Sequence, residues 1–480
     1  MSYTVAQNTS FLTVASIAQK IVSFVYFTLI ARLIGVGNTG SYFFAITFTT
    51  IFTVVADMGL GPILTREAAR YPENTAKYFN TVIWSKIFFG ITTYLMVVIF
   101  SNMLGYSISL RHLIYLSAVT MFFDNIQGAF FSVFRAKRNL IYESFGVVIA
   151  QVLTLIIGTT ALYLRAPLIW LIAAYTIPSA VIVLYAAFFL NRNYNIRLRF
   201  IFDRGLFKIL FKMALPFALA GIIGRLYSYS DTIIMSKLLT SEDMGWWSVP
   251  YKITFAFQFI PVALSASVYP AMSSLSVTDP GKVGELFIKA WKYLFVIVFP
   301  ISFGLIAIAE PVIIRLYGKA FLPSVPVMQI LLISLIFSYL SIISGALLNA
   351  TGQQKIQTLI LAVALSCNIL LNVFLIPAYG IIGAAAAALS SNILLWTAGF
   401  YFVRRSTVVY SRQLFKNGFH VLLLAFGMAL MVYFLTQKTS FLVTIPIGAL
   451  VYVSLLFVTG VLSRDLVKSM INKIIIKKIT

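Results

Sequence analysis

Apolar segments of about 20 residues recur along the whole chain, and short polar stretches rich in lysine and arginine separate them. A helix needs about 20 apolar residues to cross the hydrocarbon core of a bilayer. The pattern therefore predicts about fourteen membrane-spanning helices, and it lacks the ten-residue alternation of a β-barrel. The expected spans are 11–31, 42–62, 80–102, 113–133, 145–164, 168–190, 211–233, 247–268, 291–309, 327–349, 357–376, 381–402, 418–436 and 441–462.

Composition supports a membrane protein, because 60% of the 480 residues are hydrophobic and 10% are charged. Soluble domains carry about 25% charged residues. The net charge of +23 would suggest nucleic acid for a soluble protein. In a membrane protein, basic residues mark cytoplasmic loops instead, so we expect no nucleic-acid partner. The two histidines lie far apart, and we expect no metal site and no bound cofactor.

The distribution of the basic residues predicts the orientation in the membrane. With a cytoplasmic N-terminus, about 25 of the 36 lysines and arginines fall on the cytoplasmic side and about seven on the other. Both ends are therefore expected in the cytoplasm, in a multi-pass protein of the cytoplasmic (inner) cell membrane. The basic C-terminal stretch from 464 to 480 is expected to lie on the anionic inner leaflet.

A weak internal repeat indicates two similar halves. With a shift of 205 residues, "ARLIGVGNTGSYFF" (31–44) lies over "SKLLTSEDMGWWSV" (236–249), and Gly40 matches Gly245. Six spans separate the copies, so both halves keep the same orientation in the membrane.

The expected organisation follows from this repeat. Two six-helix lobes would face a central cleft, and two further helices and a tail would follow. The predicted parts are 1–200, 201–405, 406–463 and 464–480.

Two cations in the middle of predicted spans stand out. The same shift places Lys20 on Arg225, and a cation at mid-span costs about 2.5–3.5 kcal/mol on insertion scales. We expect both to line a central cavity. The alternative is a buried ion pair, or a cation satisfied by backbone carbonyls. Lys86 and Lys252 are weaker candidates, because a lysine near a span end can reach the interface.

Polar residues share the helical faces of these cations. The expected cavity-lining side chains are Ser16, Gln19, Ser23 and Ser228.

Three aspartates could couple transport to an ion or act as gates, namely Asp57, Asp124 and Asp231. For Asp57 the alternative is structural, because Gly59 and Gly61 are expected to break the second helix before Pro62, and Asp57 could cap it or pair with Arg66. Asp124 could equally face the cleft or bond between helices.

Two stretches resemble a known family. "TVVADMGLGPILTREAAR" (53–70) is similar to the end of the second helix in oligosaccharide flippases of the Wzx type, which move O-antigen and polysaccharide repeat units. "MALPFALAGIIGRLYSYSDTIIMSKLLTSEDMGWWSVPYKI" (213–253) resembles their seventh-helix region. These proteins belong to the multidrug/oligosaccharidyl-lipid/polysaccharide exporter superfamily, together with lipid II flippases and MATE drug exporters. The resemblance implies an all-α MATE-like fold.

The resemblance also implies a function. The cargo would be a polyprenyl-pyrophosphate-linked oligosaccharide, carried to the outer leaflet by alternating access for surface polysaccharide synthesis. Membrane lipids, glycosyltransferases and a polymerase would be partners. An anionic head group fits a cavity with cations. With no nucleotide-binding motif, a proton or sodium gradient or the membrane potential would supply the energy.

Three other readings compete with this one. A lipid II flippase would have a similar size and number of spans. A MATE-type cation-coupled drug exporter would need buried carboxylates. Lys20 and Arg225 favour an anionic cargo over this function, but Asp57, Asp124 and Asp231 could serve as its ion sites. A membrane enzyme of sugar-chain synthesis would need a catalytic loop, and no expected loop exceeds about 25 residues. We therefore expect a transporter and no catalytic residues.

Overall fold

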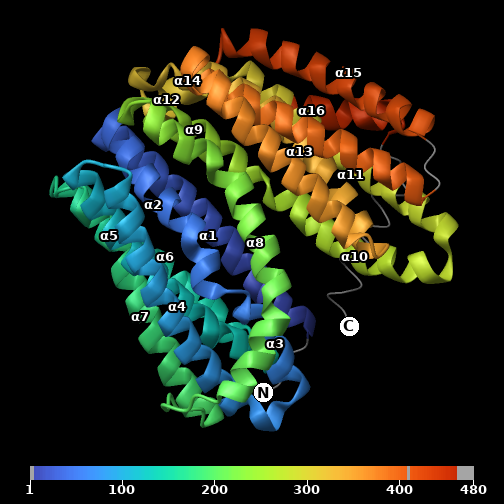
Figure 1. The fold of residues 1–480 in the computed structure, drawn as a ribbon. Coiled ribbons are helices and arrows are strands. Elements are labelled where there is room, and N and C mark those ends of the chain that lie inside the picture. Colours follow the sequence, from blue (N-terminus) through green and yellow to red (C-terminus); the bar gives the residue numbers. More distant parts are fainter. Residues whose placement is uncertain (1–4, 408–410, 462–480) are drawn as a thin grey trace. The chain divides into compact units, whose positions relative to one another are not determined.

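The computed structural model describes residues 5–407 and 411–461, and every regular element in these ranges is helical (Figure 1). Besides two 3₁₀ turns, η1 (Pro72–Asn74) and η2 (Lys319–Phe321), the helices are α1 (Val5–Ile34), α2 (Val36–Asp57), α3 (Leu60–Arg70), α4 (Thr75–Met103), α5 (Ile108–Ala136), α6 (Ile141–Tyr163), α7 (Ile169–Tyr194), α8 (Arg204–Leu238), α9 (Ser241–Phe257), α10 (Phe259–Thr278), α11 (Pro280–Ala307), α12 (Ala309–Tyr317), α13 (Ser324–Ala350), α14 (Gln354–Ser406), α15 (Ser411–Thr436) and α16 (Phe441–Val458).

The predicted class, an all-helical multi-pass membrane protein, is confirmed. Twelve helical segments of the described residues are long and apolar enough to cross a membrane. Helix α14 counts once among them, although Gly380 is non-helical (φ 58°, ψ −136°) and separates the predicted spans 357–376 and 381–402. Helix α5 covers the predicted span 113–133 but is not among the twelve. The count of fourteen stays a prediction.

The chain forms two compact units, residues 1–248 and 249–480. Helices α1 to α8 lie in the first unit and α10 to α16 in the second, while α9 crosses the boundary. The predicted lobes, 1–200 and 201–405, were placed from the sequence repeat, whereas these two units are defined by their internal contacts. The lobes therefore stay a prediction. The predicted basic tail, 464–480, lies outside the described residues.

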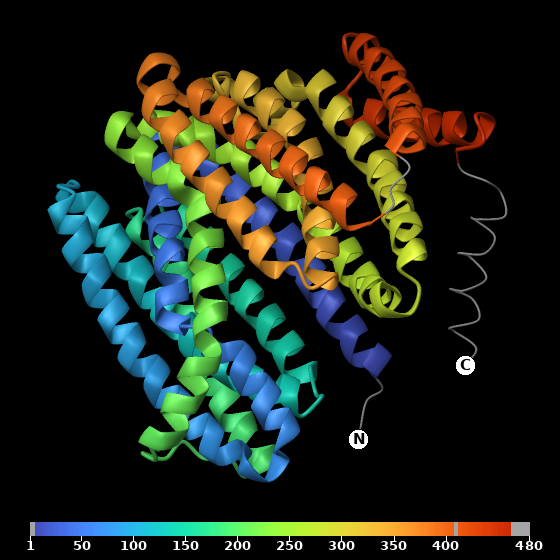
Figure 2. The ribbon, with the colours of Figure 1, turned by 45° about the vertical axis from the view of Figure 1, so that its right-hand side comes forward.

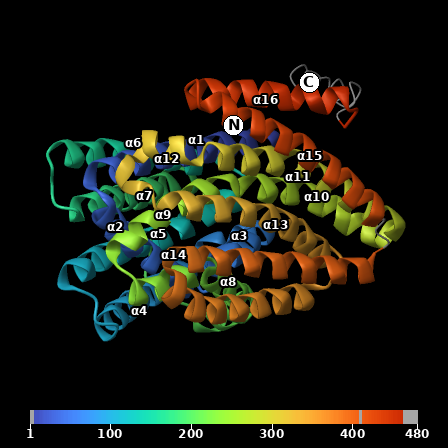
Figure 3. The ribbon, with the colours of Figure 1, turned by 90° about the horizontal axis from the view of Figure 1, so that it is seen from above.

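In the first unit, α5 is central, because it contacts α2, α3, α4 and α7. Helix α6 contacts α1 and α7, and α2 contacts α4 and α8. Figure 2 shows these helices, coloured blue to green, from a second side. In the second unit, α13 contacts α10, α11 and α14, while α15 and α16 pack on each other and on α11 (Figure 3).

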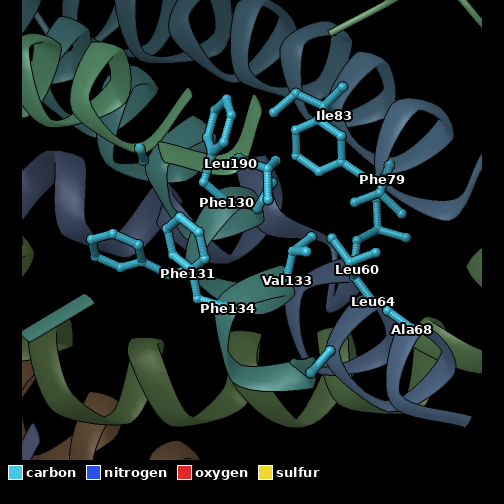
Figure 4. Packing of buried hydrophobic residues seen from close by; sticks show 14 of the residues in the cluster. Leu60, Leu64, Ala68, Phe79, Ile83, Phe130, Phe131, Val133, Phe134 and Leu190 are labelled. Atoms are coloured by element: carbon cyan, nitrogen blue, oxygen red, sulfur yellow. The ribbon is translucent and has the colours of Figure 1, made fainter. Parts of the chain in front are cut away.

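A buried cluster of apolar side chains joins α3, α4, α5, α7 and α8 (Figure 4). The rings of Phe79 and Phe130 are 5.1 Å apart between their centroids, and both are buried. Leu60 and Ile83 belong to the same cluster and are fully enclosed. This tight packing holds α3, α4 and α5 in place close to the polar residues described below.

The second predicted span is broken, as the glycines indicate. Helix α2 ends at Asp57, Met58 and Gly59 have φ values of 46° and 71°, and α3 begins at Leu60. Glycine adopts such left-handed backbone without strain. The predicted break is therefore confirmed, and it lies at Gly59. Pro62 falls in the first turn of α3, where a helix loses no hydrogen bond to proline.

Helix α8 packs directly on this break. A Cβ atom at Gly59 would lie 2.6 Å from the carbonyl oxygen of Ala214 of α8, so only glycine permits this approach. Asp203 caps α8 by accepting from Leu206 N at 2.9 Å, and its other oxygen binds Lys77 Nζ of α4 at 2.8 Å. These contacts place α8, the seventh predicted span, in the first unit.

A reciprocal contact between two glycines supports the repeat. A Cβ atom at Gly40 would lie 1.8 Å from the carbonyl oxygen of Ser241, and one at Gly245 would lie 2.2 Å from that of Val36. The 205-residue shift maps Gly40 onto Gly245 and Val36 onto Ser241. Each contact is therefore the counterpart of the other under this shift.

Candidate functional site

The first unit contains a cavity of about 620 Å³ whose walls come from α2, α3, α4, α5 and α8. Four of its lining side chains are ionisable, and they carry two positive and two negative charges. They are Asp57, Lys86, Asp124 and Arg225. The sequence predicted all four as site residues, and the structure brings them to one cavity. Ser228 also lines it.

Lys86 is almost completely buried, with 1% of its surface exposed, and it forms an ion pair with Asp57. Its Nζ atom lies 2.5 Å from Asp57 Oδ1. The Asp57 side chain is 33% exposed and lines the cavity. Lys86 was expected to offer its charge to a cargo, but in this structure its ammonium is held by the protein. The suggested pairing of Asp57 with Arg66 is wrong, because Arg66 binds Glu67 at 2.8 Å instead.

Asn125 completes the surroundings of Lys86. The backbone oxygen and the Oδ1 atom of Asn125 each accept from Lys86 Nζ at 3.2 Å. Its Nδ2 atom donates to the carbonyl oxygens of Ala56 at 3.0 Å and of Lys86 at 3.1 Å. Asn125 thus ties α5 to both α2 and α4. Burying an ammonium is costly unless it is paired and hydrogen-bonded, and here both conditions are met.

Asp124 lies on the cavity side of α5 and is exposed there. Its Oδ1 atom accepts from Ser179 Oγ of α7 at 2.6 Å. It therefore contributes a carboxylate to the cavity surface while it also bonds α5 to α7. Of the two alternatives considered from the sequence, the structure shows the bond between helices, and a position facing a cleft between two lobes stays a prediction.

Arg225 is exposed on α8 where that helix lines the cavity. Within the part of the chain that the structure describes, it forms no ion pair. Small residues surround it, since Gly221 and Gly224 precede it on the same wall. The guanidinium is thus a cation that a ligand in the cavity can reach.

The predicted residues of α1 do not line this cavity. Lys20 and Gln19 are exposed on α1, and Ser16 is partly buried. Ser23 hydrogen-bonds the hydroxyl group of Tyr175 of α7. The pairing of Lys20 with Arg225 in one cavity stays a prediction.

The two remaining predicted residues are also absent from the cavity lining. Asp231 is 7% exposed near the end of α8, and its Oδ1 atom accepts from Ser230 Oγ at 3.3 Å. Lys252 lies in the second unit on α9 and is partly buried.

Two residues that shape the site, Asn125 and Ser179, were not among the predicted site residues. The role of Asn125 depends on a lysine 39 positions away. Ser179 was not considered, and it reaches Asp124 across 55 positions. Among the described residues, no group of three or more histidines, cysteines or carboxylates could hold a metal ion.

The second unit has a different cavity, of about 480 Å³, between α11, α15 and α16. None of its lining residues is charged. Typical members of the lining are Val296, Pro300, Leu305, Met428, Val432 and Ile445.

The model of the polysaccharide biosynthesis protein family matches residues 5–276. This match covers more than half of the chain, including all residues that line the charged cavity. The chain belongs to this family.

Relatives within the family agree with this assignment. The chain is 22% identical over 405 residues to the capsular polysaccharide biosynthesis protein CapF of Staphylococcus aureus, covering 83% of this chain and 99% of that protein. It is 33% identical over 174 residues to the probable flippase AglR of Haloferax volcanii, covering 35% of this chain and 36% of that protein.

A solved structure confirms the expected fold. The lipid II flippase MurJ in an inward closed conformation superposes with a TM-score of 0.75 at 18% identity, covering 92% of this chain and 97% of that one. This member of the polysaccharide biosynthesis family therefore has the fold that the resemblance implied.

Proposed function

We propose that this protein is a flippase that carries a lipid-linked oligosaccharide from the cytoplasmic to the outer leaflet of the cell membrane. The observation that carries the proposal is the family match over 5–276, together with relatives named for capsular polysaccharide synthesis and for flipping. The protein acts as a transporter, not as an enzyme. Its cargo is a polyprenyl-pyrophosphate-linked repeat unit for surface polysaccharide.

The charged cavity supports an anionic cargo. A pyrophosphate cannot cross the hydrocarbon core without a polar path and a countercharge. Arg225 is exposed in the cavity and forms no ion pair among the described residues, so it can bind phosphate oxygens. A guanidinium binds phosphate with two parallel hydrogen bonds, which an ammonium cannot do. The carboxylates of Asp57 and Asp124 can accept hydrogen bonds from sugar hydroxyl groups.

The loop contacts support the predicted orientation. Three loops predicted to be cytoplasmic meet at one end of the first unit. Lys137 Nζ donates to Pro72 O at 3.3 Å, and Asn80 Nδ2 donates to Arg197 O at 3.2 Å. A shared basic end is what the positive-inside rule requires of the cytoplasmic side. Both termini are proposed to lie on that side of the cytoplasmic membrane.

Alternating access is the proposed mechanism. The cavity would open first to the cytoplasm and then to the outside, as the two repeated halves move. A proton or sodium gradient, or the membrane potential, would drive the cycle. Glycosyltransferases that assemble the cargo and a polymerase that consumes it are the proposed partners.

Two other transport functions share this fold. The match to the lipid II flippase is a likeness of fold at 18% identity, so it does not favour lipid II as cargo. A cation-coupled drug exporter would use Asp57 and Asp124, but Lys86 already neutralises Asp57. Rescue of a strain depleted of its lipid II flippase, or drug resistance in a pump-deleted host, would point to these functions instead.

The proposal is tested by complementation. The chain is expressed in a bacterial strain that lacks its own oligosaccharide flippase, and surface polysaccharide is measured. We expect Arg225→Ala to abolish rescue, Arg225→Lys to restore part of it, and Arg204→Ala, an exposed arginine at the start of the same helix, to have no effect. Lys20→Ala is expected to act as Arg225→Ala does.

Immunoblots of membranes must show equal amounts of each variant. Normal polysaccharide with Arg225→Ala would contradict the assignment of Arg225. No rescue by the unmodified chain, tested with several cargo types, would contradict the proposed function itself.

A further inference from the structure

Lys86 is buried beside the cavity in a state that leaves it no free hydrogen-bond donor. An ammonium has three N–H groups. Nζ has three acceptors within hydrogen-bond distance, namely Asp57 Oδ1 at 2.5 Å and two oxygens of Asn125 at 3.2 Å. A cargo phosphate can therefore bind Lys86 only if one of these acceptors leaves.

The three acceptors differ in how firmly they are held. One is a backbone oxygen of α5, and the second belongs to the Asn125 side chain, which also donates to the backbones of α2 and α4. Asp57 has no such anchoring. It is the last residue of α2, Met58 and Gly59 follow it in left-handed conformations, and a third of its side chain is exposed in the cavity. Asp57 is the acceptor that can be exchanged.

We propose that the cargo phosphate replaces Asp57 on Lys86, and that Asp57 then takes up a proton from the water of the cavity. This inference rests on the proposed function. The hydrogen bond from Lys86 Nζ to Asp57 Oδ1 breaks, and one from Nζ to a phosphate oxygen forms. The buried ammonium keeps a negative partner throughout, which avoids the cost of an unpaired charge.

The other charges around Asp57 explain the proton uptake. From the packed helices, α4 contributes Lys86 to the cavity lining, α5 contributes Asp124, and α8 contributes Arg225, while α3 contributes no charged residue. Once the phosphate holds Lys86 and Arg225, Asp57 faces that phosphate and the Asp124 carboxylate without a cation of its own. Like charges at close range favour protonation of a carboxylate. Cargo binding and proton binding are thus coupled through one lysine.

Calorimetry tests this exchange on the purified full-length protein. The probe is farnesyl pyrophosphate, titrated at pH 7 in two buffers with different enthalpies of ionisation, so that the protons taken up per ligand can be counted. We expect the unmodified chain to take up about one proton more per ligand than Asp57→Asn, which also binds the probe more tightly. Lys86→Gln should bind about tenfold to a hundredfold more weakly.

Two further variants serve as controls. Asp203→Asn removes the carboxylate of a second α4 lysine–aspartate pair, Lys77–Asp203, which lies outside the cavity, and it should leave the proton count unchanged. Proton uptake that persists in Asp57→Asn would overturn the exchange.

Further outcomes distinguish a folding defect, and an error in the proposed function, from a failure of the exchange. If Asp57→Asn does not elute as a monodisperse peak, Asp57→Asn combined with Lys86→Gln removes both charges of the pair. That double variant should bind weakly and take up no extra proton, and retained uptake would reject the exchange. Failure of the unmodified chain to bind any pyrophosphate probe would reject the proposed function. Normal binding with a proton count independent of Asp57 would reject the exchange alone.

Discussion

The two cavities of this protein are similar in size but opposite in chemistry. The cavity of the first unit, about 620 Å³, has four charged lining residues, whereas that of the second unit, about 480 Å³, has none. In the first, a buried lysine is bound by residues of two neighbouring helices. In the second, aliphatic side chains, proline and methionine cover the walls.

The difference between the two cavities shows how a membrane protein accommodates a charge within the bilayer. A charge persists where helices bring fixed partners to it, and the partners must come from different elements to hold it in place. Asn125 illustrates this, because it bonds to the backbones of α2 and α4 at once. The apolar cavity has no charged or amide side chain in its lining, so a charge placed there would have no such fixed partner.

The largest expected effect comes from breaking the buried pair. Asp57→Asn leaves Lys86 buried without a negative partner, and we expect a loss of about 3–5 kcal/mol in stability. Lys86→Gln should cost less, because Asp57 is partly exposed and can turn to the cavity water. Thermal unfolding in detergent measures both variants. The double variant should lose less than the sum of the two single losses, and strict additivity would show that the pair is not coupled.

A charge introduced into the apolar cavity should have the next largest effect. Val432 is 3% exposed and lines that cavity. Val432→Lys is expected to destabilise the protein by about 2.5–3.5 kcal/mol, and the variant should accumulate poorly in membranes. Val432→Leu is the matched control, and it should change stability by less than about 1.5 kcal/mol, because the cavity beside it has room for one more methylene group. If Val432→Lys proved as stable as this control, the distinction between the two cavities would be removed.

The smallest effect concerns glycines that line the two cavities. A Cβ atom at Gly448 would lie 2.6 Å from Val432 Cγ2, whereas one at Gly224 would meet no atom within 4 Å. We expect Gly448→Ala to destabilise by about 1–2 kcal/mol through overpacking. Gly224→Ala should be neutral or should stabilise by about 0.5–1 kcal/mol, since alanine favours the helix. Equal unfolding temperatures for both variants would contradict this difference in packing.

Much of the site was predictable from residue type and position. Four ionisable residues inside predicted spans, Asp57, Lys86, Asp124 and Arg225, were singled out because a charge at membrane depth needs a reason. All four line one cavity. Lys20 was singled out by the same rule, and it does not line that cavity. The rule identifies which residues are unusual, but it does not say which of them meet.

The sequence by itself determined the class of the protein, the positions of most helices and the break at Gly59. These properties depend on local composition, on the 3.6-residue period and on the backbone freedom of single residues, all of which act within a few turns of the chain. Only the tertiary structure decided that Lys86 binds Asp57 across 29 positions, that Asn125 joins three helices, and that α8 packs with the first unit. Such contacts depend on how helices cross and how closely their backbones approach, and short-range patterns in the sequence do not encode these distances.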